Sequence, residues 1–192
     1  KKYNLFILHD AAHALETEHE NKKIGDTDYA SAFSFYANKN ITTGGEGGAV
    51  STNNGDIAKK VKKLSLHGIT KDGWHRFKDN GNWEYDITEL GYKYNLTDLA
   101  ASFGIWQFKN VNNWNNKRKL IAEKYLSLLS NVEGLILPKK VNGHAWHLFV
   151  IRININCWKI TRDEIIQKLN MKGIGLAVHY KPIHQLSYYK NN

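Results

Sequence analysis

A glycine-rich loop directly after an aromatic segment is the feature that most constrains how this chain can fold. Residues 29–36 are rich in aromatic side chains, residues 44–48 contain four glycines, and an apolar segment resumes at Ala49. Glycine at this density marks irregular backbone rather than the interior of a helix or strand. The sequence therefore predicts a strand, a polar loop and a second strand in succession, with Lys39 displayed on the loop.

Lys39 is the first candidate for a chemical role. An amine at the end of a strand can attack a carbonyl carbon, provided that the protein keeps it unprotonated. The alternative is a solvated lysine in a turn, because most lysines in proteins are exposed. The residues that share its pocket must decide between these two interpretations.

Polar residues follow a predicted strand at the start of the chain. Residues 5–8 form a continuous apolar run, which is typical of a parallel strand buried on both faces. Asp10 lies just beyond this run and His13 three residues later, at the edge where open α/β sheets bind ligands. A turn residue and a loop histidine are the alternatives for these two. Ser34, in the next strand, either donates a hydrogen bond to a phosphate or a ring oxygen or is a small residue in a tight sheet.

The second half of the chain alternates between helical and strand patterns. Thr97 can cap a helix that carries Leu99, Phe103 and Trp106 inward, and residues 112–116 are expected to interrupt it. The helical pattern resumes over residues 117–129, where we expect Ile121, Tyr125, Leu128 and Leu129 to pack in a core.

A small α/β layer is predicted at the C-terminal end. Residues 144–153 and 174–180 have strand patterns, and residues 161–164 form a capping box that opens a helix between them. Together with the first half, this order of elements predicts an α/β fold with a mostly parallel central sheet.

Composition excludes several classes of protein. The net charge of +9 permits nucleic acid or a small polyanion such as a nucleotide diphosphate as a ligand, but the lysines are scattered rather than clustered. A single cysteine, Cys157, allows neither an internal disulfide nor a cysteine-built metal site. The histidines of the second half have no carboxylate or cysteine at ligand spacing, so no metal is expected.

The sequence also carries no membrane or export signal. No apolar stretch approaches the roughly 20 residues of a membrane helix, and no signal peptide is recognisable. We therefore expect a cytoplasmic protein. The chain starts at Lys1 and ends without a terminal helix signal, so we expect a piece of a larger protein.

Several stretches together resemble one enzyme family, the nucleotide-sugar aminotransferases of the DegT/StrS group, and in particular its 4-keto-sugar branch. They occur in the family's order at residues 10–15, 33–36, 39–43, 46–48, 66–69, 91–98 and 144–149. The resemblance implies a pyridoxal-phosphate enzyme of fold type I that works as a homodimer. It implies that residues 1–116 are part of the large cofactor-binding domain and residues 117–192 part of the small C-terminal domain.

The resemblance also implies roles for individual residues around the cofactor. Lys39 would form the Schiff base with pyridoxal 5'-phosphate, Asp10 would bind the pyridine nitrogen, His13 would lie near the ring and Ser34 would help to hold the phosphate. Physical chemistry requires such a set independently, because a carboxylate keeps the ring nitrogen protonated and an amine carries the aldehyde.

Further positions follow the family pattern on the substrate side. Lys93 stands where many relatives have an asparagine that reaches the phosphate of the partner subunit, and Asn95 is the second candidate for that contact. His179, Tyr180 and His184 would bind the nucleotide side of the substrate. A second departure is the pair Gly44 and Gly45, where many relatives have one glycine.

The predicted reaction moves an amino group from glutamate to a keto-sugar carried by a nucleotide, most simply a UDP-4-keto sugar, in amino-sugar or polysaccharide biosynthesis. Relatives with histidine in place of the lysine are dehydrases, and the retained Lys39 favours aminotransfer. The alternatives are a non-catalytic relative that acts as a binding or regulatory protein, and a basic nucleic-acid module.

Overall fold

The structure is a computed structural model of the 192-residue chain, and it describes residues 2, 3, 5–70 and 84–191. The chain divides into two compact units. The first unit comprises Lys1–Tyr125 and Lys139–Phe149, and the second comprises Leu126–Pro138 and Val150–Asn192. The predicted domain boundary at residues 116 and 117 stays a prediction.

A three-stranded sheet organises the first unit. Strand β4 (Ala30–Ser34) lies between β1 (Leu8–Asp10), which is parallel to it, and β5 (Gly48–Ser51), which is antiparallel. Asp10 pairs with Ala32, and the backbone N–H of Ala11 donates to Ala32 O at 2.9 Å. Because β1 and β4 are parallel, their carboxyl ends share one edge of the sheet.

The apolar run at residues 5–8 does not form a strand buried on both faces, as the sequence predicted. Strand β1 begins only at Leu8, and Leu5 and Phe6 are 71% and 69% exposed. Within the described residues β1 has a single neighbouring strand, β4, so it is an edge strand. Two-sided burial of an apolar strand requires covering layers on both faces of the sheet, and the described residues do not provide them here.

Residues 53–56 have the pattern of a turn and helix start, and Ile57, Val61 and Leu64 recur at helical spacing, which predicts a helix here. Helix α1 (Gly55–Leu64) follows β5 and begins at that place. The Asn54 side chain accepts hydrogen bonds from the N–H groups of Asp56 and Ile57, which is the bonding pattern of a helix N-cap. After α1 the chain returns to pair with residues 92–94, where His67 N donates to Tyr92 O at 2.8 Å. Residues 70–86, which include Trp74 and Trp83, have no clear periodicity, so the sequence predicts a long loop there. Most of this stretch lies outside the described residues.

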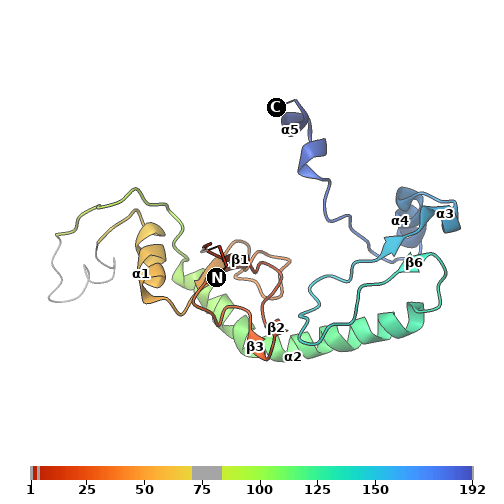
Figure 1. The fold of residues 1–192 in the computed structure, drawn as a ribbon, viewed down its shortest axis with the longest axis horizontal. Helices are drawn as coiled ribbons and strands as arrows, with labels where there is room; N and C mark the ends of the chain where they lie inside the picture. The colour runs from red at the N-terminus through yellow and green to blue at the C-terminus, as the bar shows by residue number, and fades with distance from the viewer. Residues whose placement is uncertain (1, 4, 71–83, 192) are drawn as a thin grey trace. The chain divides into compact units, whose positions relative to one another are not determined.

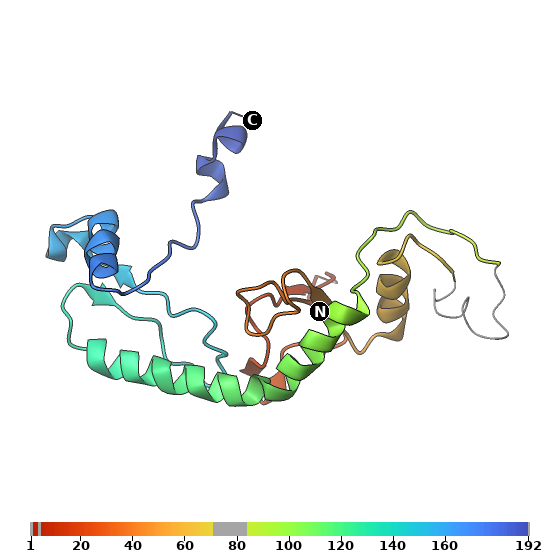
Figure 2. The same ribbon diagram turned by 180° about the vertical axis from the view of Figure 1, so that it is seen from behind.

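Helix α2 (Asp98–Leu129) runs unbroken for 32 residues (Figures 1 and 2). Thr97 caps it as expected, because its Oγ1 accepts from Ala100 N at 3.3 Å. The predicted interruption at residues 112–116 is wrong. Asparagine only weakly disfavours helix, and this segment contains neither proline nor glycine to break the ladder of backbone hydrogen bonds.

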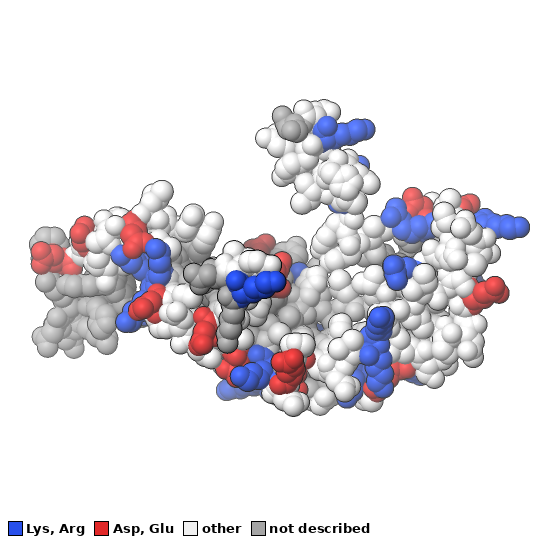
Figure 3. Space-filling model, in the orientation of Figure 1, with Lys and Arg blue, Asp and Glu red and all other residues white. Residues whose placement is uncertain are grey.

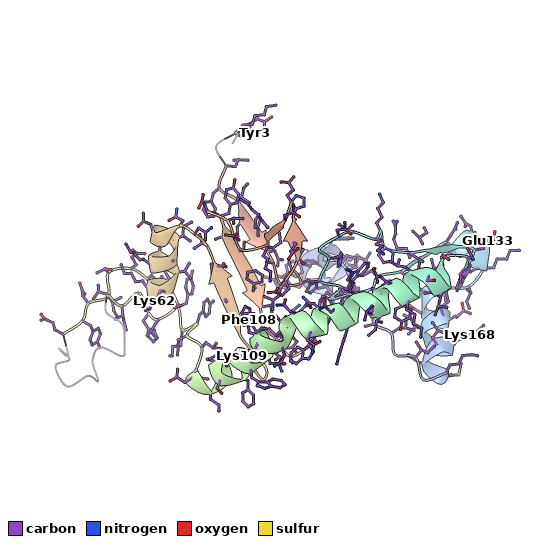
Figure 4. All side chains as sticks on the ribbon, turned by 90° about the horizontal axis from the view of Figure 1, so that it is seen from below. Tyr3, Lys62, Phe108, Lys109, Glu133 and Lys168 are labelled. Atoms are coloured by element: carbon purple, nitrogen blue, oxygen red, sulfur yellow. The ribbon has the colours of Figure 1, made fainter. Side chains whose placement is uncertain are left out.

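The predicted core-facing side of α2 is also wrong for the part of the chain that the structure describes. Val111 and Ala122 are its buried residues. The apolar residues expected to point inward are instead largely exposed; they are Leu99, Phe103, Trp106, Ile121, Tyr125 and Leu128. Phe108 lies beside the sheet (Figure 4) and lines one cavity with Phe33 and Phe35. Fewer residues of α2 are therefore buried than its apolar pattern predicts.

The second unit holds a two-stranded sheet of β6 (Leu135–Ile136) and β7 (Arg152–Ile153), followed by helices α3 (Ile155–Trp158) and α4 (Arg162–Met171). The predicted capping box is present at the start of α4. Its hydrogen bonds from Thr161 lower the pKa of the Glu164 carboxyl. The 3₁₀ turn η2 (Ile183–Gln185) and helix α5 (Ser187–Lys190) complete this unit.

Two strands predicted in the second half are not formed as expected. Of residues 144–153, only Arg152 and Ile153 are in a strand, and Trp146 has a φ of +48° that an extended strand cannot contain. Residues 174–180 have no strand partner among the described residues. Hydrophobic alternation alone does not make a strand, because the ladder needs a neighbour at the right distance.

The segment that connects β1 to β4 contains a short antiparallel hairpin of β2 (Glu18–His19) and β3 (Lys22–Lys23).

None of the helices in the described ranges is both long and apolar enough to cross a membrane. Figure 3 shows lysine and arginine side chains interspersed with acidic ones on the face it presents. That distribution matches the scattered lysines of the sequence rather than a continuous basic track.

Candidate active site

The Lys39 amine meets an imidazole. Its Nζ lies 2.8 Å from His13 Nε2, a hydrogen-bond distance between residues 26 positions apart in the sequence. Lys39 is half-buried and His13 is exposed. The sequence proposed both residues for one pocket, and the structure brings them into direct contact.

Asp10 and Ser34 end two neighbouring parallel strands. Asp10 is the last residue of β1 and Ser34 the last residue of β4, so both lie at the carboxyl edge of the sheet. Asp10 Oδ1 accepts a hydrogen bond from Ala12 N at 3.1 Å, which fixes the turn that leads to His13. Ser34 Oγ accepts from Tyr36 N at 3.4 Å, just before the Lys39 loop. An amine, an imidazole, a carboxylate and a hydroxyl thus come from adjoining segments of the first unit.

The donor set of this edge fits pyridoxal phosphate. The group needs an amine for its aldehyde, a carboxylate for its ring nitrogen and hydroxyl or backbone donors for its phosphate. Lys39, Asp10 and Ser34 provide these three functions, and the glycine-rich segment 44–48 adds backbone N–H groups beside Ser34, since Ser34 pairs with Gly48. The roles of the individual residues remain predictions.

His147 is a residue of this site that the sequence did not single out. Its ring packs on the His13 ring, with centroids 4.2 Å apart and planes tilted by 46°. His147 belongs to the segment Lys139–Phe149 of the first unit. It occurs within the stretch 144–149 that resembles the family, and that position was the only signal available in the sequence.

A second histidine fixes the turn from which His147 projects. Trp146 N donates to His144 Nδ1 at 2.8 Å, and the two rings stack with centroids 4.3 Å apart. Trp146 is buried, and its left-handed backbone is unusual for a bulky residue. Partial burial of the imidazole lowers the pKa of His144. The neutral ring is therefore favoured in the folded protein, as its role as a hydrogen-bond acceptor at Nδ1 requires.

This lowered pKa predicts a pH-dependent stability. The unfolded chain binds a proton at His144 near pH 6.5, whereas the folded chain resists it, so stability falls as the pH drops below about 6.5 and through the folded pKa. His144→Asn keeps an acceptor for Trp146 N and cannot titrate. We expect the unfolding temperature of the wild type to fall more steeply than that of His144→Asn between about pH 7.5 and 5.5, measured by circular dichroism. Parallel curves would contradict the assignment of this proton to His144.

Lys93 and Asn95 lie together on the segment that pairs with residues 64–67. Lys93 Nζ donates to Asn95 Oδ1, and both residues are exposed. Tyr92 and Tyr94 stack beside them with ring centroids 4.9 Å apart. The contact that the resemblance implies, with the phosphate of a partner subunit, stays a prediction.

The three proposed substrate residues belong to the second unit. His179 and Tyr180 stack with ring centroids 3.9 Å apart, and His184 lies in the turn η2. All three are exposed. His179 and Tyr180 thus form a local pair, and the role of the three residues in substrate binding is a proposal.

A lysine, an aspartate and a histidine thus come from adjoining segments at one edge of the sheet in the first unit. The model of the DegT/DnrJ/EryC1/StrS aminotransferase family matches residues 1–192. The chain belongs to this family.

Relatives and solved structures extend the comparison. The chain is 48% identical to the uncharacterized protein MJ1066 of Methanocaldococcus jannaschii and 40% identical to the spore coat polysaccharide biosynthesis protein SpsC of Bacillus subtilis, covering 99% of this chain in each case. It covers 50% and 49% of those proteins, so it spans about half their length. The structure of Helicobacter pylori PseC, an aminotransferase of pseudoaminic acid biosynthesis, matches with a TM-score of 0.85 and 30% identity over 99% of this chain and 49% of PseC.

These matches confirm the predicted fold class. The chain has the α/β fold of the type I pyridoxal-phosphate enzymes and covers about half of it. They also confirm the cofactor at the level of the family. A putative sugar aminotransferase of Streptococcus pneumoniae, Spr1654, has been solved in a pyridoxal-phosphate form that matches with a TM-score of 0.80 and 32% identity, over 97% of this chain and 46% of that one.

Proposed function

We propose that the whole protein is a pyridoxal-phosphate-dependent aminotransferase that acts on a keto-sugar. The observation that carries the proposal is the 2.8 Å contact between Lys39 Nζ and His13 Nε2, beside the strand ends that carry Asp10 and Ser34. Family membership supports it, because PseC is an aminotransferase of pseudoaminic acid biosynthesis and SpsC a protein of polysaccharide biosynthesis.

The residues of this chain have distinct tasks in the proposed reaction. When bound, pyridoxal phosphate supplies an aldehyde that accepts amines and a ring that withdraws electron density. Lys39 would hold the cofactor through Nζ, and the same atom would carry a proton during the reaction. The Asp10 carboxylate would stabilise the protonated ring nitrogen, and the Ser34 hydroxyl would donate to the phosphate.

His13 has a place beside the reacting amine. Its Nε2 can donate to or accept from Lys39 Nζ, depending on the tautomer. An imidazole in this position orients the amine by a hydrogen bond. The ring of His147 packs against His13 and limits the tilt of its ring.

The finer assignment follows the sequence resemblance. Glutamate is the amino donor and a nucleotide-linked 4-keto sugar, such as a UDP sugar, is the acceptor. The products are 2-oxoglutarate and an amino sugar, so atoms and charge balance across the two half-reactions. The enzyme is a cytoplasmic homodimer in which Lys93 or Asn95 reaches the phosphate of the partner subunit, and His179, Tyr180 and His184 contact the nucleotide.

One experiment tests this function in two stages. The full natural chain is loaded with pyridoxal phosphate and mixed with glutamate alone, and 2-oxoglutarate is measured. We expect one molecule of 2-oxoglutarate for each loaded site. Without a keto-sugar to accept the amino group, each site can react only once.

In the second stage a panel of nucleotide keto-sugars is added. An accepted sugar converts the single release of 2-oxoglutarate into repeated turnover. A loaded protein that releases none with glutamate, or with any other amino donor tried, would indicate a binding protein rather than an aminotransferase.

A further inference from the structure

We propose that Arg118 is a positioning residue that, together with Asn115, holds the Lys39 loop and the His13 loop at the distance seen here. Both residues lie in the middle of α2, and their side chains bond to the backbone carbonyls of Leu15 and Asn40 in these loops. The inference rests on the proposed function of Lys39, and it adds the part of the fold that sets where this amine lies.

The backbone directly after Lys39 is the best-buried part of its loop. Asn40, Ile41 and Thr43 are 3%, 2% and 4% exposed, whereas Lys39 itself is half-buried. A lysine side chain has many rotamers, so its amine is placed only as well as the backbone that carries it. The anchoring of residues 40–43 therefore decides the position of Nζ.

One stripe of α2 provides this anchoring. Gly104, Gln107, Val111, Asn115 and Arg118 follow each other at intervals of three and four residues, which places them on one face of the helix. A Cβ at Gly104 would lie 2.8 Å from Thr43 Cγ2, so only glycine allows the helix to approach this closely. Gln107 Oε1 accepts from Thr42 N at 3.2 Å, and Val111 is 2% exposed.

Arg118 binds the backbone of Asn40, the residue directly after Lys39. Its guanidinium donates from one terminal nitrogen to the backbone carbonyl of Asn40 at 2.9 Å and from the other to Asn115 Oδ1 at 3.0 Å. Both acceptors are neutral, so the side chain acts here as a rigid two-pronged donor. Desolvation by burial lowers the pKa of Arg118, which agrees with its enclosed position. A lysine cannot reproduce this fork, because its donors radiate from a single nitrogen.

Asn115 links Arg118 to the loop that carries His13. Its Nδ2 donates to the carbonyl of Leu15, two residues after His13, at 3.4 Å, and its Oδ1 also accepts from Asn40 Nδ2 at 3.5 Å. The other amide atom of Asn40, Oδ1, is buried and has no hydrogen-bond partner in the described part of the chain. The two segments that meet at the Lys39–His13 contact are thus tied to one pair of α2 residues.

The consequence for the reaction is a dependence of the amine on a distant arginine. A displacement of about 1 Å at a reacting atom can cost roughly 100-fold in rate, and loosened anchoring gives part of that loss. We expect Arg118→Met, which keeps the apolar stem but has no donors, to slow the reaction of Lys39 with pyridoxal phosphate about tenfold. Arg118→Lys restores one of the two hydrogen bonds and is expected to slow it about threefold.

The test follows two reactions of Lys39 in the full natural chain. In the first, the amine nitrogen bonds to the aldehyde carbon of added pyridoxal phosphate and the aldehyde oxygen leaves as water, which visible absorbance records. In the second, without cofactor, an amine-acylating reagent labels Lys39, and mass spectrometry of the peptide gives the rate. Arg118→Met should slow the first reaction and, because it frees the half-buried amine, accelerate the second about threefold.

Two control variants separate positioning from loss of stability. Lys117→Met changes an exposed neighbour on α2, and Ile165→Ala removes a buried side chain from the second unit. The first should leave the unfolding temperature and both rates within about twofold of wild type. The second should lower the unfolding temperature and leave both rates unchanged. Opposite shifts of the two rates in Arg118→Met are not expected from a merely structural residue.

The outcomes distinguish this inference from the proposed function. If wild type links the cofactor and Arg118→Met reacts at the wild-type rate, the inference is wrong and the function stands. If the wild-type protein forms no bond with pyridoxal phosphate, the proposed function is wrong. The acylation rates of Lys39 then test by themselves whether Arg118 positions the amine. If Arg118→Met does not fold, Arg118→Lys and Asn115→Ala carry the same comparison.

Discussion

Replacing Lys39 by alanine is expected to abolish the covalent link to pyridoxal phosphate and to lower aminotransfer by at least about 1,000-fold, because one side chain serves as anchor and as proton carrier. Visible absorbance of the loaded protein and formation of 2-oxoglutarate from glutamate measure the two losses. The structure predicts little change in stability, since Lys39 is half-buried and its Nζ contact is with His13. The unfolding temperature therefore provides the check that the variant is folded.

Lys22→Ala is the matched control for this variant. Lys22 is an exposed lysine of β3 in the same unit, and its loss should change neither the absorbance nor the rate. If Lys39→Ala kept the absorbance of a lysine-linked cofactor, another lysine would be the anchor. The site at the carboxyl edge of β1 and β4 would then be wrong.

Asp10→Asn is expected to have the second-largest effect, and of a different kind. A carboxylate near a cation shifts its pKa by about one to three units, so the amide should reduce the protonated fraction of the ring nitrogen, and with it the rate, by roughly 10- to 1,000-fold. Asparagine keeps an acceptor for Ala12 N, which donates to Asp10 Oδ1 at 3.1 Å, so the turn toward His13 should persist. The covalent link to Lys39 should therefore remain while turnover falls.

The measurement is absorbance and rate on the same preparation of Asp10→Asn. Asp28→Asn, at an exposed position just before β4, is the control and should behave as wild type. A variant of Asp10 with normal turnover would contradict the assignment of this carboxylate to the ring nitrogen. Loss of the covalent link together with turnover would instead assign Asp10 a structural role.

The parts of the fold that local sequence determines were predictable. The Asn54 cap of α1 and the capping box at Thr161 depend on side chains within three residues of the bonds they make, and both are present. The strand–loop–strand order around Lys39 follows from aromatic and glycine content, and β4 and β5 confirm it. The resemblance then identified the family and the fold correctly.

The parts that depend on distant partners were not predictable. The asparagines at residues 112–116 suggested a break, yet α2 continues through them, and Asn115 bonds to Leu15 a hundred positions away. Residues 174–180 alternate like a strand but have no partner strand in the described part of the chain. The same reason explains the exposed run at residues 5–8, because burial requires a covering layer that hydrophobicity alone does not provide.

The candidate site shows the same division. Asp10, His13, Ser34 and Lys39 could be named in advance because each ends or follows a strand or carries a family motif. His147 and Arg118 could not be assigned, since the first acts through the ring of His13 and the second through the backbone of Asn40. Neither contact has a sequence spacing that a motif could record.

Lys39 is proposed as the covalent anchor of pyridoxal phosphate. The most direct test loads the full natural chain with the cofactor, reduces the link with borohydride and maps the modified peptide by mass spectrometry. We expect a single phosphopyridoxyl group on the Lys39 amine, absent from Lys39→Ala. An adduct on another lysine, or none on a folded and loaded protein, would contradict it.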